Sequence, residues 1–329
     1  MLKYNFNKKY LDIKRFDVLK NGCIITNSNN GFYFDLDKIN IEPLLWFYDE
    51  NLIWIKDNNW QNFIYDTNSK ILTKNKLVPY IGSISKDFLL VFHDGITVYN
   101  KNSNQIVSKL DTDIDSFKFS FFHNKTVLIT TETAILTFSI QEGYLKWSKI
   151  DLEVEKTIGI SQNQLLVGLK SGLLIALDID TGAQLWQTQE NVPIQNLRLS
   201  ESEGILYGLQ SNYYVSINAA NGHILELLDI GDYLETYYNQ YEKKHIIDMR
   251  HCRYCNGQLF FAAGPISYTR HVGVFDTVTK KIIFSIEIDA PKGVSILASA
   301  DNFQVTKDKI YALDSNKTLH IFEREQDEV

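Results

Sequence analysis

The segment His251-Cys252-Arg253-Tyr254-Cys255 carries the residue types in this chain that are most capable of chemistry. A Cys-x-x-Cys pair preceded by His offers three soft ligands of the kind that bind zinc. A strong zinc signature needs a second matching pair, and the third cysteine, Cys23, lies far away in the sequence. Two interpretations follow: a weak metal site at His251, Cys252 and Cys255, or a single strand with buried thiols. We favour the second and expect no metal and no cofactor.

Other chemical motifs are incomplete or missing. The run of Asp111, Asp113 and Asp115 supplies oxygen ligands suited to calcium, but the glycine and the distal glutamate of a full calcium loop are lacking. The sequence contains no Gly-rich phosphate loop, no G-x-S-x-G elbow and no H-E-x-x-H motif. We therefore predict no catalytic residues and a protein that is not an enzyme.

Two irregular segments offer a binding surface instead. Tyrosine buries a large area while keeping a polar tip, and it is enriched at protein interfaces. Gly231–Lys244 is unusually rich in tyrosine, and Gly264–His271 is a second segment without strand character. The residues predicted to bind a partner are Tyr233, Tyr237, Tyr238, Tyr241, Tyr268, Arg270 and His271. The alternative is that the first segment forms a loop helix packed on its own blade.

Short strands separated by turns must position these segments, and Leu165–Gln187 shows the unit most clearly. An apolar run at 165–167 is followed by a turn at Ser171-Gly172, a second run at 173–177, a turn from Asp178 to Gly182, and Leu185-Trp186. Strands at this spacing indicate an antiparallel meander, in which Asp bonds the turn amides and Gly accepts a positive φ.

The same unit recurs along the whole chain. Its anchor is a polar or turn residue after an apolar run, and the anchors are Asp35, Asp66, Asn100, Ser139, Asp178, Asn218, Asp276 and Glu323. Spacings near 40 residues are typical of four-stranded propeller blades. We predict one all-β domain over residues 1–329: a β-propeller of about eight four-stranded blades, with seven as the alternative and an insertion near 231–245. Because the last repeat lacks an outer strand, we expect residues 3–7 to supply it and close the ring.

One repeat also resembles a known family. Ala176-Leu177-Asp178, Thr181-Gly182 and Leu185-Trp186 are similar to the repeat of the pyrroloquinoline-quinone (PQQ)-type propellers. That superfamily includes quinoprotein dehydrogenases and a periplasmic lipoprotein scaffold of outer-membrane assembly. The resemblance implies the fold, and fold does not imply function. The enzymes use a calcium-bound quinone that is often backed by a vicinal disulfide, and this chain has no adjacent Cys pair, which disfavours quinone-dependent catalysis.

The charge and composition of the chain limit the classes of partner that we expect it to bind. The net charge is −7, from 33 basic and 40 acidic residues, and no dense Lys/Arg block is present, so we expect no nucleic-acid partner. The N-terminal residues do not resemble a secretory signal, and no stretch approaches 18 uninterrupted apolar residues. We expect no membrane partner and a cytoplasmic monomer.

These observations favour a non-catalytic propeller that binds a protein partner through one face. An immunity or antitoxin-type protein of a bacterial competition system is one specific version. The alternative is binding of a small ligand, sugar or quinone, or an enzyme activity, at the central pocket. The inner strands expected near residues 13–19, 44–48, 194–199 and 246–249 are mostly apolar, with Arg198 and Asp248 as exceptions, which disfavours that alternative.

Overall fold

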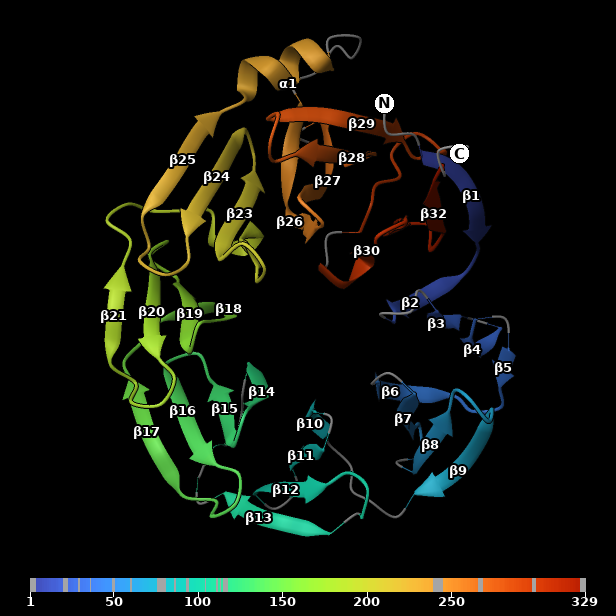
Figure 1. Cartoon of the computed structure of the whole chain (residues 1–329). Coiled ribbons are helices and arrows are strands. Elements are labelled where there is room, and N and C mark those ends of the chain that lie inside the picture. The colour runs from blue at the N-terminus through green and yellow to red at the C-terminus, as the bar shows by residue number, and fades with distance from the viewer. Residues whose placement is uncertain are drawn as a thin grey trace.

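The chain folds into eight four-stranded antiparallel sheets arranged around a central axis, as shown by a computed structural model (Figure 1). The structure describes residues 4–19, 23–28, 30–35, 37–48, 51–59, 61–75, 81–85, 87–92, 95–103, 105–110, 112, 114, 118–238, 245–265, 269–297 and 300–325. The predicted eight-bladed β-propeller is confirmed, and the seven-bladed alternative is excluded.

Four blades form the first half of the ring, each built outward from the channel. Their strands are β2 (Ile13–Val18), β3 (Ile24–Ser28), β4 (Gly31–Phe34) and β5 (Asp37–Ile39) in blade 1; β6 (Pro43–Tyr48), β7 (Leu52–Asp57), β8 (Asn62–Asp66) and β9 (Ile71–Asn75) in blade 2; β10 (Ile81–Ile84), β11 (Phe88–Phe92), β12 (Ile96–Asn100) and β13 (Ile106–Leu110) in blade 3; and β14 (Phe119–His123), β15 (Thr126–Thr130), β16 (Ala134–Ser139) and β17 (Leu145–Ile150) in blade 4.

The second half of the ring repeats this order. Its strands are β18 (Val154–Ser161), β19 (Gln164–Leu169), β20 (Leu174–Asp178) and β21 (Gln184–Gln187) in blade 5; β22 (Arg198–Ser200), β23 (Ile205–Gln210), β24 (Tyr213–Asn218) and β25 (Ile224–Asp229) in blade 6; β26 (His245–Cys255), β27 (Gln258–Pro265), β28 (His271–Asp276) and β29 (Lys281–Glu287) in blade 7; and β30 (Phe303–Val305), β31 (Lys309–Leu313) and β32 (Leu319–Arg324) in blade 8.

The N-terminal strand completes blade 8. Strand β1 (Tyr4–Tyr10) pairs antiparallel with β32, with Tyr4 opposite Arg324 and Tyr10 opposite Leu319. The two ends of the chain therefore share one sheet, and this confirms the predicted closure of the ring by an N-terminal strand. Closure leaves no blade face exposed at a gap in the ring.

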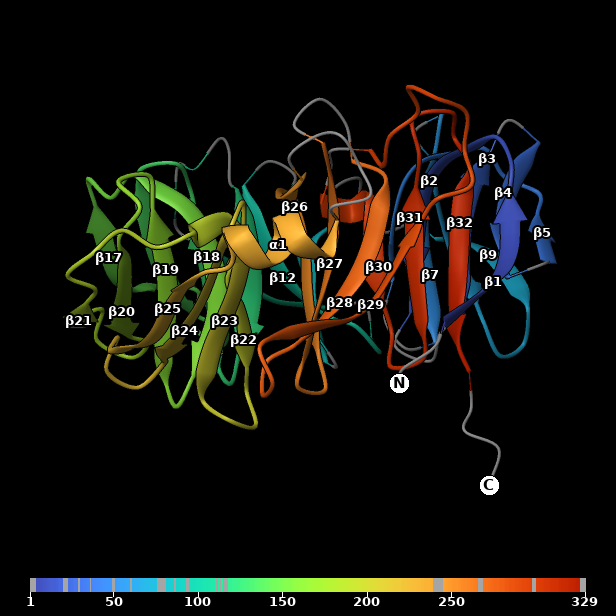
Figure 2. The ribbon, with the colours of Figure 1, turned by 90° about the horizontal axis from the view of Figure 1, so that it is seen from above.

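Each blade buries both of its faces against its neighbours. Successive strand residues point to opposite faces, so Leu165 and Val167 pack against blade 4 while Leu166 packs against blade 6. The buried apolar residues of the described chain fall into eight clusters, one for each junction between adjacent blades. The core is thus a ring of apolar layers around the axis, and Figure 2 shows the strands running between the two faces of the resulting disc.

The predicted anchors all lie at the ends of the third strands. Asp178 accepts hydrogen bonds from the backbone amides of Asp180 (3.1 Å) and Thr181 (2.8 Å), and Gly182 follows at φ +74°. Lys70 and Lys280 occupy the same turn position as Gly182, with φ of +60° and +58°. The turn is therefore retained even where its glycine is replaced.

One contact joins the outer strand of a blade to the turn of the next. A Cβ on Gly182 would lie 2.7 Å from the ring of Trp147 in the preceding blade, and a Cβ on Gly222 would lie 2.4 Å from Trp186. Trp147 also donates a 2.9 Å hydrogen bond to the carbonyl of Ile179. Because the indole lies directly on the turn, glycine is required there for space as well as for its φ.

At the next junction an ion pair takes the place of this contact. Glu226 stands on β25 where Trp186 stands on β21, and Lys280 stands in the turn where Gly222 stands in blade 6. The Lys280 Nζ lies 2.7 Å from the Glu226 Oε2 and 4.8 Å from the centroid of the Tyr214 ring. The same two positions are thus in contact at this junction too, although both residue types differ from those at the preceding junction.

We predict that Gly182→Ala lowers the free energy of unfolding by about 2–4 kcal/mol, since it combines a strained φ with a clash against Trp147. Gly257 is the matched control, because it has φ +75° and nothing within 4 Å of the added Cβ. Gly257→Ala should cost only about 1 kcal/mol. Urea unfolding of the two variants measures the difference, and equal losses would remove the role assigned to the indole.

Candidate functional site

The two irregular segments predicted to form a binding surface are brought together. The first begins with the helix α1 (Gly231–Tyr237) and connects β25 to β26, and the second connects β27 to β28. The rings of Tyr238 and His271 lie 5.0 Å apart between their centroids. Tyr241 and Tyr268 lie outside the described residues. The predicted proximity of the two connections therefore holds for Tyr238 and His271.

The helix α1 is held by the hydroxyl groups of Tyr233 and of Tyr238, the residue that follows the helix. The Tyr233 hydroxyl accepts a 2.8 Å hydrogen bond from the backbone amide of Ile282, and the Tyr238 hydroxyl lies 2.8 Å from Ser285 Oγ. Tyr238 is almost fully buried, whereas Tyr237 is 37% exposed. Burial raises the pKa of Tyr233 and of Tyr237 above the ordinary value. Tyr233 and Tyr238 thus fasten α1 to β29, and Tyr237 presents the more open surface.

Arg270 and His271 also make contacts within their own blade. The Arg270 Nε lies 2.8 Å from the Glu287 Oε1, and its terminal nitrogens donate to the carbonyls of Ile288 (3.4 Å), Ala290 (2.7 Å) and Pro291 (3.3 Å). His271 is buried. These contacts order the connection after β29, and a binding role for Arg270 and His271 stays a prediction.

The residues weighed as zinc ligands point in different directions. Cys252 packs at the junction of blades 6 and 7, and Cys255 packs at the junction of blades 7 and 8. His251 Nε2 lies 2.5 Å from the Leu297 carbonyl. Within the described ranges, no group of three or more His, Cys, Asp or Glu side chains is arranged to hold a metal ion. The two thiols are thus used separately in the packing on opposite faces of blade 7.

The wall of the central channel is more polar than the sequence suggested. Lys156, Arg198 and Arg253 lie on β18, β22 and β26, the innermost strands of three consecutive blades. The Lys156 Nζ and one Arg198 terminal nitrogen donate to the same two carbonyls, those of Gln195 and Leu197, at 2.8–3.1 Å. The two positive head groups are therefore neighbours.

The prediction of an inner strand over residues 194–199 was wrong for most of its length. Residues 194–196 form a short 3-10 turn, and β22 begins only at Arg198. The carbonyls of this turn and of Leu197 are the ones that Lys156 and Arg198 share. Asp248 lies within β26, but its side chain is outside what the structure describes. Sequence reasoning missed Lys156 and Arg253, because only the closed ring shows that their strands face one channel.

The positive charges in the channel wall perturb one another. All three side chains are half-buried, so each is partly exposed to solvent but largely surrounded by protein. Burial, reinforced by the Arg198 guanidinium, lowers the pKa of Lys156 to about 7. Burial and Arg198 together lower the pKa of Arg253 to about 10. The protein thus holds these cations where their charge is unfavourable.

The facing wall holds a buried carboxylate. Asp17 accepts a 2.7 Å hydrogen bond from the indole nitrogen of Trp46 and lies 3.3 Å from an Arg15 terminal nitrogen. The Arg15 guanidinium carbon stands 4.2 Å from the centroid of the Trp46 ring. Burial raises the pKa of Asp17, and burial together with Asp17 raises the pKa of Tyr48 to about 12. The inner strand of blade 1 therefore carries a carboxylate that is paired with a cation of the same strand.

Exposed apolar side chains gather on the rim of blade 6. Leu225 and Leu227 on β25 are each 45% exposed, and Leu228, which points to the opposite face of the strand from Leu227, is 37% exposed. Tyr213 on β24 and Tyr237 on α1 complete this set, which we call the blade 6 patch. These five are a third of the fifteen exposed large apolar residues among those described. Strand β25 is also the last strand of its sheet, so one of its edges has no partner strand.

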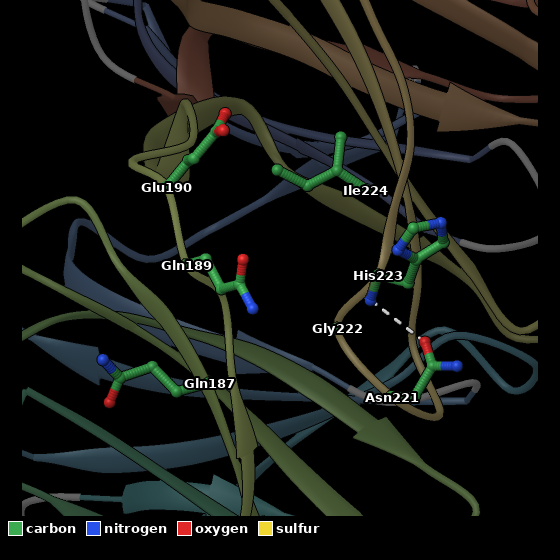
Figure 3. A pocket seen from close by; sticks show the side chains of 7 residues that line it. All are labelled: Gln187, Gln189, Glu190, Asn221, Gly222, His223 and Ile224. Atoms are coloured by element: carbon green, nitrogen blue, oxygen red, sulfur yellow. Dashed lines mark hydrogen bonds between the residues drawn. The ribbon is translucent and has the colours of Figure 1, made fainter.

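A shallow groove borders the patch. It has a volume of about 630 Å³ and lies between the end of blade 5 and the β24–β25 turn. Figure 3 shows Gln187, Gln189 and Glu190 on one side and Asn221, His223 and Ile224 on the other. The His223 amide donates a 3.0 Å hydrogen bond to the Asn221 side chain, which orders the turn. The groove therefore has a polar lining and adjoins the first exposed leucine of the patch.

We predict that Tyr233→Phe lowers the free energy of unfolding by about 1–3 kcal/mol, because the Ile282 amide loses its hydrogen-bond acceptor in a buried place. Tyr238→Phe should cost about 1 kcal/mol. Tyr237→Phe is the control and should be neutral. Chemical denaturation measures all three, and an unchanged stability of Tyr233→Phe would contradict this account of how α1 is fastened.

Lys156→Met should stabilise the protein at neutral pH. Since folding lowers the pKa of Lys156 from 10.5 to about 7, the cost of the buried ammonium is complete below pH 7 and declines as the pH rises toward 10.5. Partial exposure screens that cost, so we expect a gain of about 1 kcal/mol at pH 6.5 and almost none at pH 10. Urea unfolding at both pH values, in buffer without multivalent anions, measures it; a loss of stability at pH 6.5 would refute the prediction.

Two solved structures share the architecture over almost their whole length. The computationally designed Ika8 protein has a TM-score of 0.64 and 13% identity, with 97% of this chain and 98% of that chain covered. BamB from Moraxella catarrhalis has a TM-score of 0.52 and 14% identity, with 98% and 100% covered. No protein-family model matches the sequence, and no curated protein is detectably similar to it. In the described part of the chain, no helix is long and apolar enough to cross a membrane. At these identities the likeness concerns the fold alone, and the chain is an eight-bladed β-propeller.

Proposed function

We propose that this propeller is a protein-binding module whose partner docks on the blade 6 patch. The observation that carries the proposal is the concentration of Leu225, Leu227, Leu228, Tyr213 and Tyr237 on one part of the rim. An apolar cluster on the surface of a soluble domain commonly marks a protein interaction site. Each leucine that the partner covers would contribute roughly 1–2 kcal/mol.

The charge of this region specifies the chemistry of the partner. Residues 213–237 contain no Lys or Arg but include Glu226, Asp229, Asp232 and Glu235. Lys280 neutralises Glu226, so Asp229, Asp232 and Glu235 carry the remaining negative charge. The complementary partner presents apolar side chains flanked by Lys or Arg. Complementary charge would speed the encounter and select this partner.

The geometry of the rim suits an extended partner segment. Strand β25 has one unpaired edge, and an extended peptide can add to such an edge through backbone hydrogen bonds. Helix α1 follows directly after β25 and is fastened to β29 by Tyr233. A surface held in place before binding loses little entropy when the partner docks.

Two narrower statements belong to this proposal. The contacts of Trp147 and Trp186 with the next blade support placing the chain among PQQ-type propellers, without assigning it a partner. An immunity or antitoxin role in a bacterial cytoplasm is a specific version of this proposal, and assaying complex formation with the products of neighbouring genes tests it. The proposed binding site does not depend on either statement.

We predict that the double variant Leu225→Lys/Leu227→Lys loses its partner while remaining folded. Immobilised wild-type protein should retain one protein from a lysate of the source cells at near-stoichiometric amount. The double variant should retain at least tenfold less of it, because burying two ammonium groups opposes docking. Ile150→Lys is the control, since Ile150 is 68% exposed on the rim of blade 4.

The control should retain as much partner as the wild type, and all variants should unfold at similar urea concentrations, since exposed substitutions rarely change stability. Equal retention by the double variant, or equal loss by Ile150→Lys, would contradict docking on the blade 6 patch.

A further inference from the structure

On the described part of the channel wall of blades 5 to 7, Lys156 and Arg198 carry positive charge without a paired carboxylate. Lys156 and Arg198 direct their head groups to the carbonyls of Gln195 and Leu197. Among the described residues, no carboxylate lies within ion-pairing distance of either. Seven other Lys or Arg side chains of the described residues pair with Asp or Glu, as Lys280 does with Glu226 at 2.7 Å.

The charged groups around Lys156 are mostly positive. Arg198 lies on β22 and Arg253 on β26, and the buried thiol of Cys252 lies between these strands. Lys118, next to β14, donates a 2.9 Å hydrogen bond to the Val154 carbonyl on β18. The adjacent acid, Glu155, is hydrogen-bonded to the side chain of Gln195. The Asp301 carboxylate influences Arg253 from the other side. Neither Lys156 nor Arg198 therefore has a carboxylate partner among the described residues.

Neighbouring like charges in a partly desolvated wall are unfavourable unless something compensates them. Backbone carbonyls supply partial negative charge, but an oxyanion supplies a full charge and accepts hydrogen bonds from ammonium and guanidinium groups together. Lys156, Arg198 and Arg253 are half-buried on innermost strands, so each remains partly accessible to solvent. An anion in the channel would meet donors from three blades.

We propose that Lys156, Arg198 and Arg253 form a binding site for the carboxylate or phosphate-type group of a small anionic molecule in the central channel. This site lies on the innermost strands and is separate from the blade 6 patch, which lies on the outer strand β25. It therefore does not depend on the proposed protein partner.

Calorimetric titration with two probes tests the proposal: sulfate as a tetrahedral oxyanion, and malonate as a carboxylate. Neither probe changes its charge appreciably between pH 6.5 and pH 8.5, and sodium chloride keeps the ionic strength constant. We expect at least one probe to bind the wild-type protein at pH 6.5. Its affinity should fall at least tenfold in Lys156→Met and in Arg198→Met. The probe that binds more tightly identifies the oxyanion geometry that the site prefers.

The pH dependence provides an independent readout. Because Lys156 loses its proton near pH 7, wild-type affinity should fall several-fold from pH 6.5 to pH 8.5. Lys156→Arg keeps the charge, so it should bind at both pH values with little change. Lys170→Met is the control: Lys170 is exposed on the same blade and should leave affinity unchanged. Thermal unfolding of each variant verifies that it is folded.

Two results would overturn the proposal. One is that neither probe binds the wild-type protein at pH 6.5 at concentrations up to about 10 mM. This limit corresponds to a binding free energy weaker than about 3 kcal/mol. The other is that Lys156→Met, Arg198→Met and Lys170→Met all bind as the wild type does, which would place the anion elsewhere on the surface. Leu225→Lys/Leu227→Lys should bind both probes normally, so failure of this site and failure of the protein-binding site are distinguishable.

Discussion

The structure depends on burying both faces of every blade against its neighbours. A four-stranded sheet of about 20 residues buries too little apolar surface to be stable alone, and stacking in a ring gives each face a partner. At the rim, Trp147 and Trp186 lie on the glycine turns of the next blade, and Glu226 and Lys280 make the equivalent contact as an ion pair. This contact fixes the orientation of one blade relative to the next. The relative positions of the inner strands, and hence of the channel residues, follow from it.

Much of this fold could be predicted from local sequence, because the repeat depends on local turn chemistry. Asp178 bonds two amides of its own turn, and Gly182 accepts the positive φ that the turn requires, so both leave a recognisable pattern. Lys70 and Lys280 adopt the same φ without glycine, which made their repeats fainter but left the spacing intact. The segment 194–199 was misassigned because a 3-10 turn and a short strand look alike at that length.

The functional surfaces were less predictable, since they depend on contacts between distant residues. The hydroxyl of Tyr233 turns inward to Ile282, and this could not be known from the composition of its helix. Lys156, Arg198 and Arg253 are up to 97 residues apart in sequence and meet only around the channel. The closed ring thus presents two separate environments: an acidic, apolar rim at blade 6 and a positively charged wall inside. A protein partner suits the first, and a small anion suits the second.

The closure of the ring by β1 is the claim on which both environments rest. Equilibrium unfolding of the chain without residues 1–10 tests it most directly, with the peptide of those residues added back as a second arm. We predict that removal exposes the edge of β32, lowers the free energy of unfolding by at least about 3 kcal/mol and broadens the transition, and that the peptide restores part of the loss. An unchanged unfolding curve for the shortened chain would contradict the account, because the ring would then be stable without its closing strand.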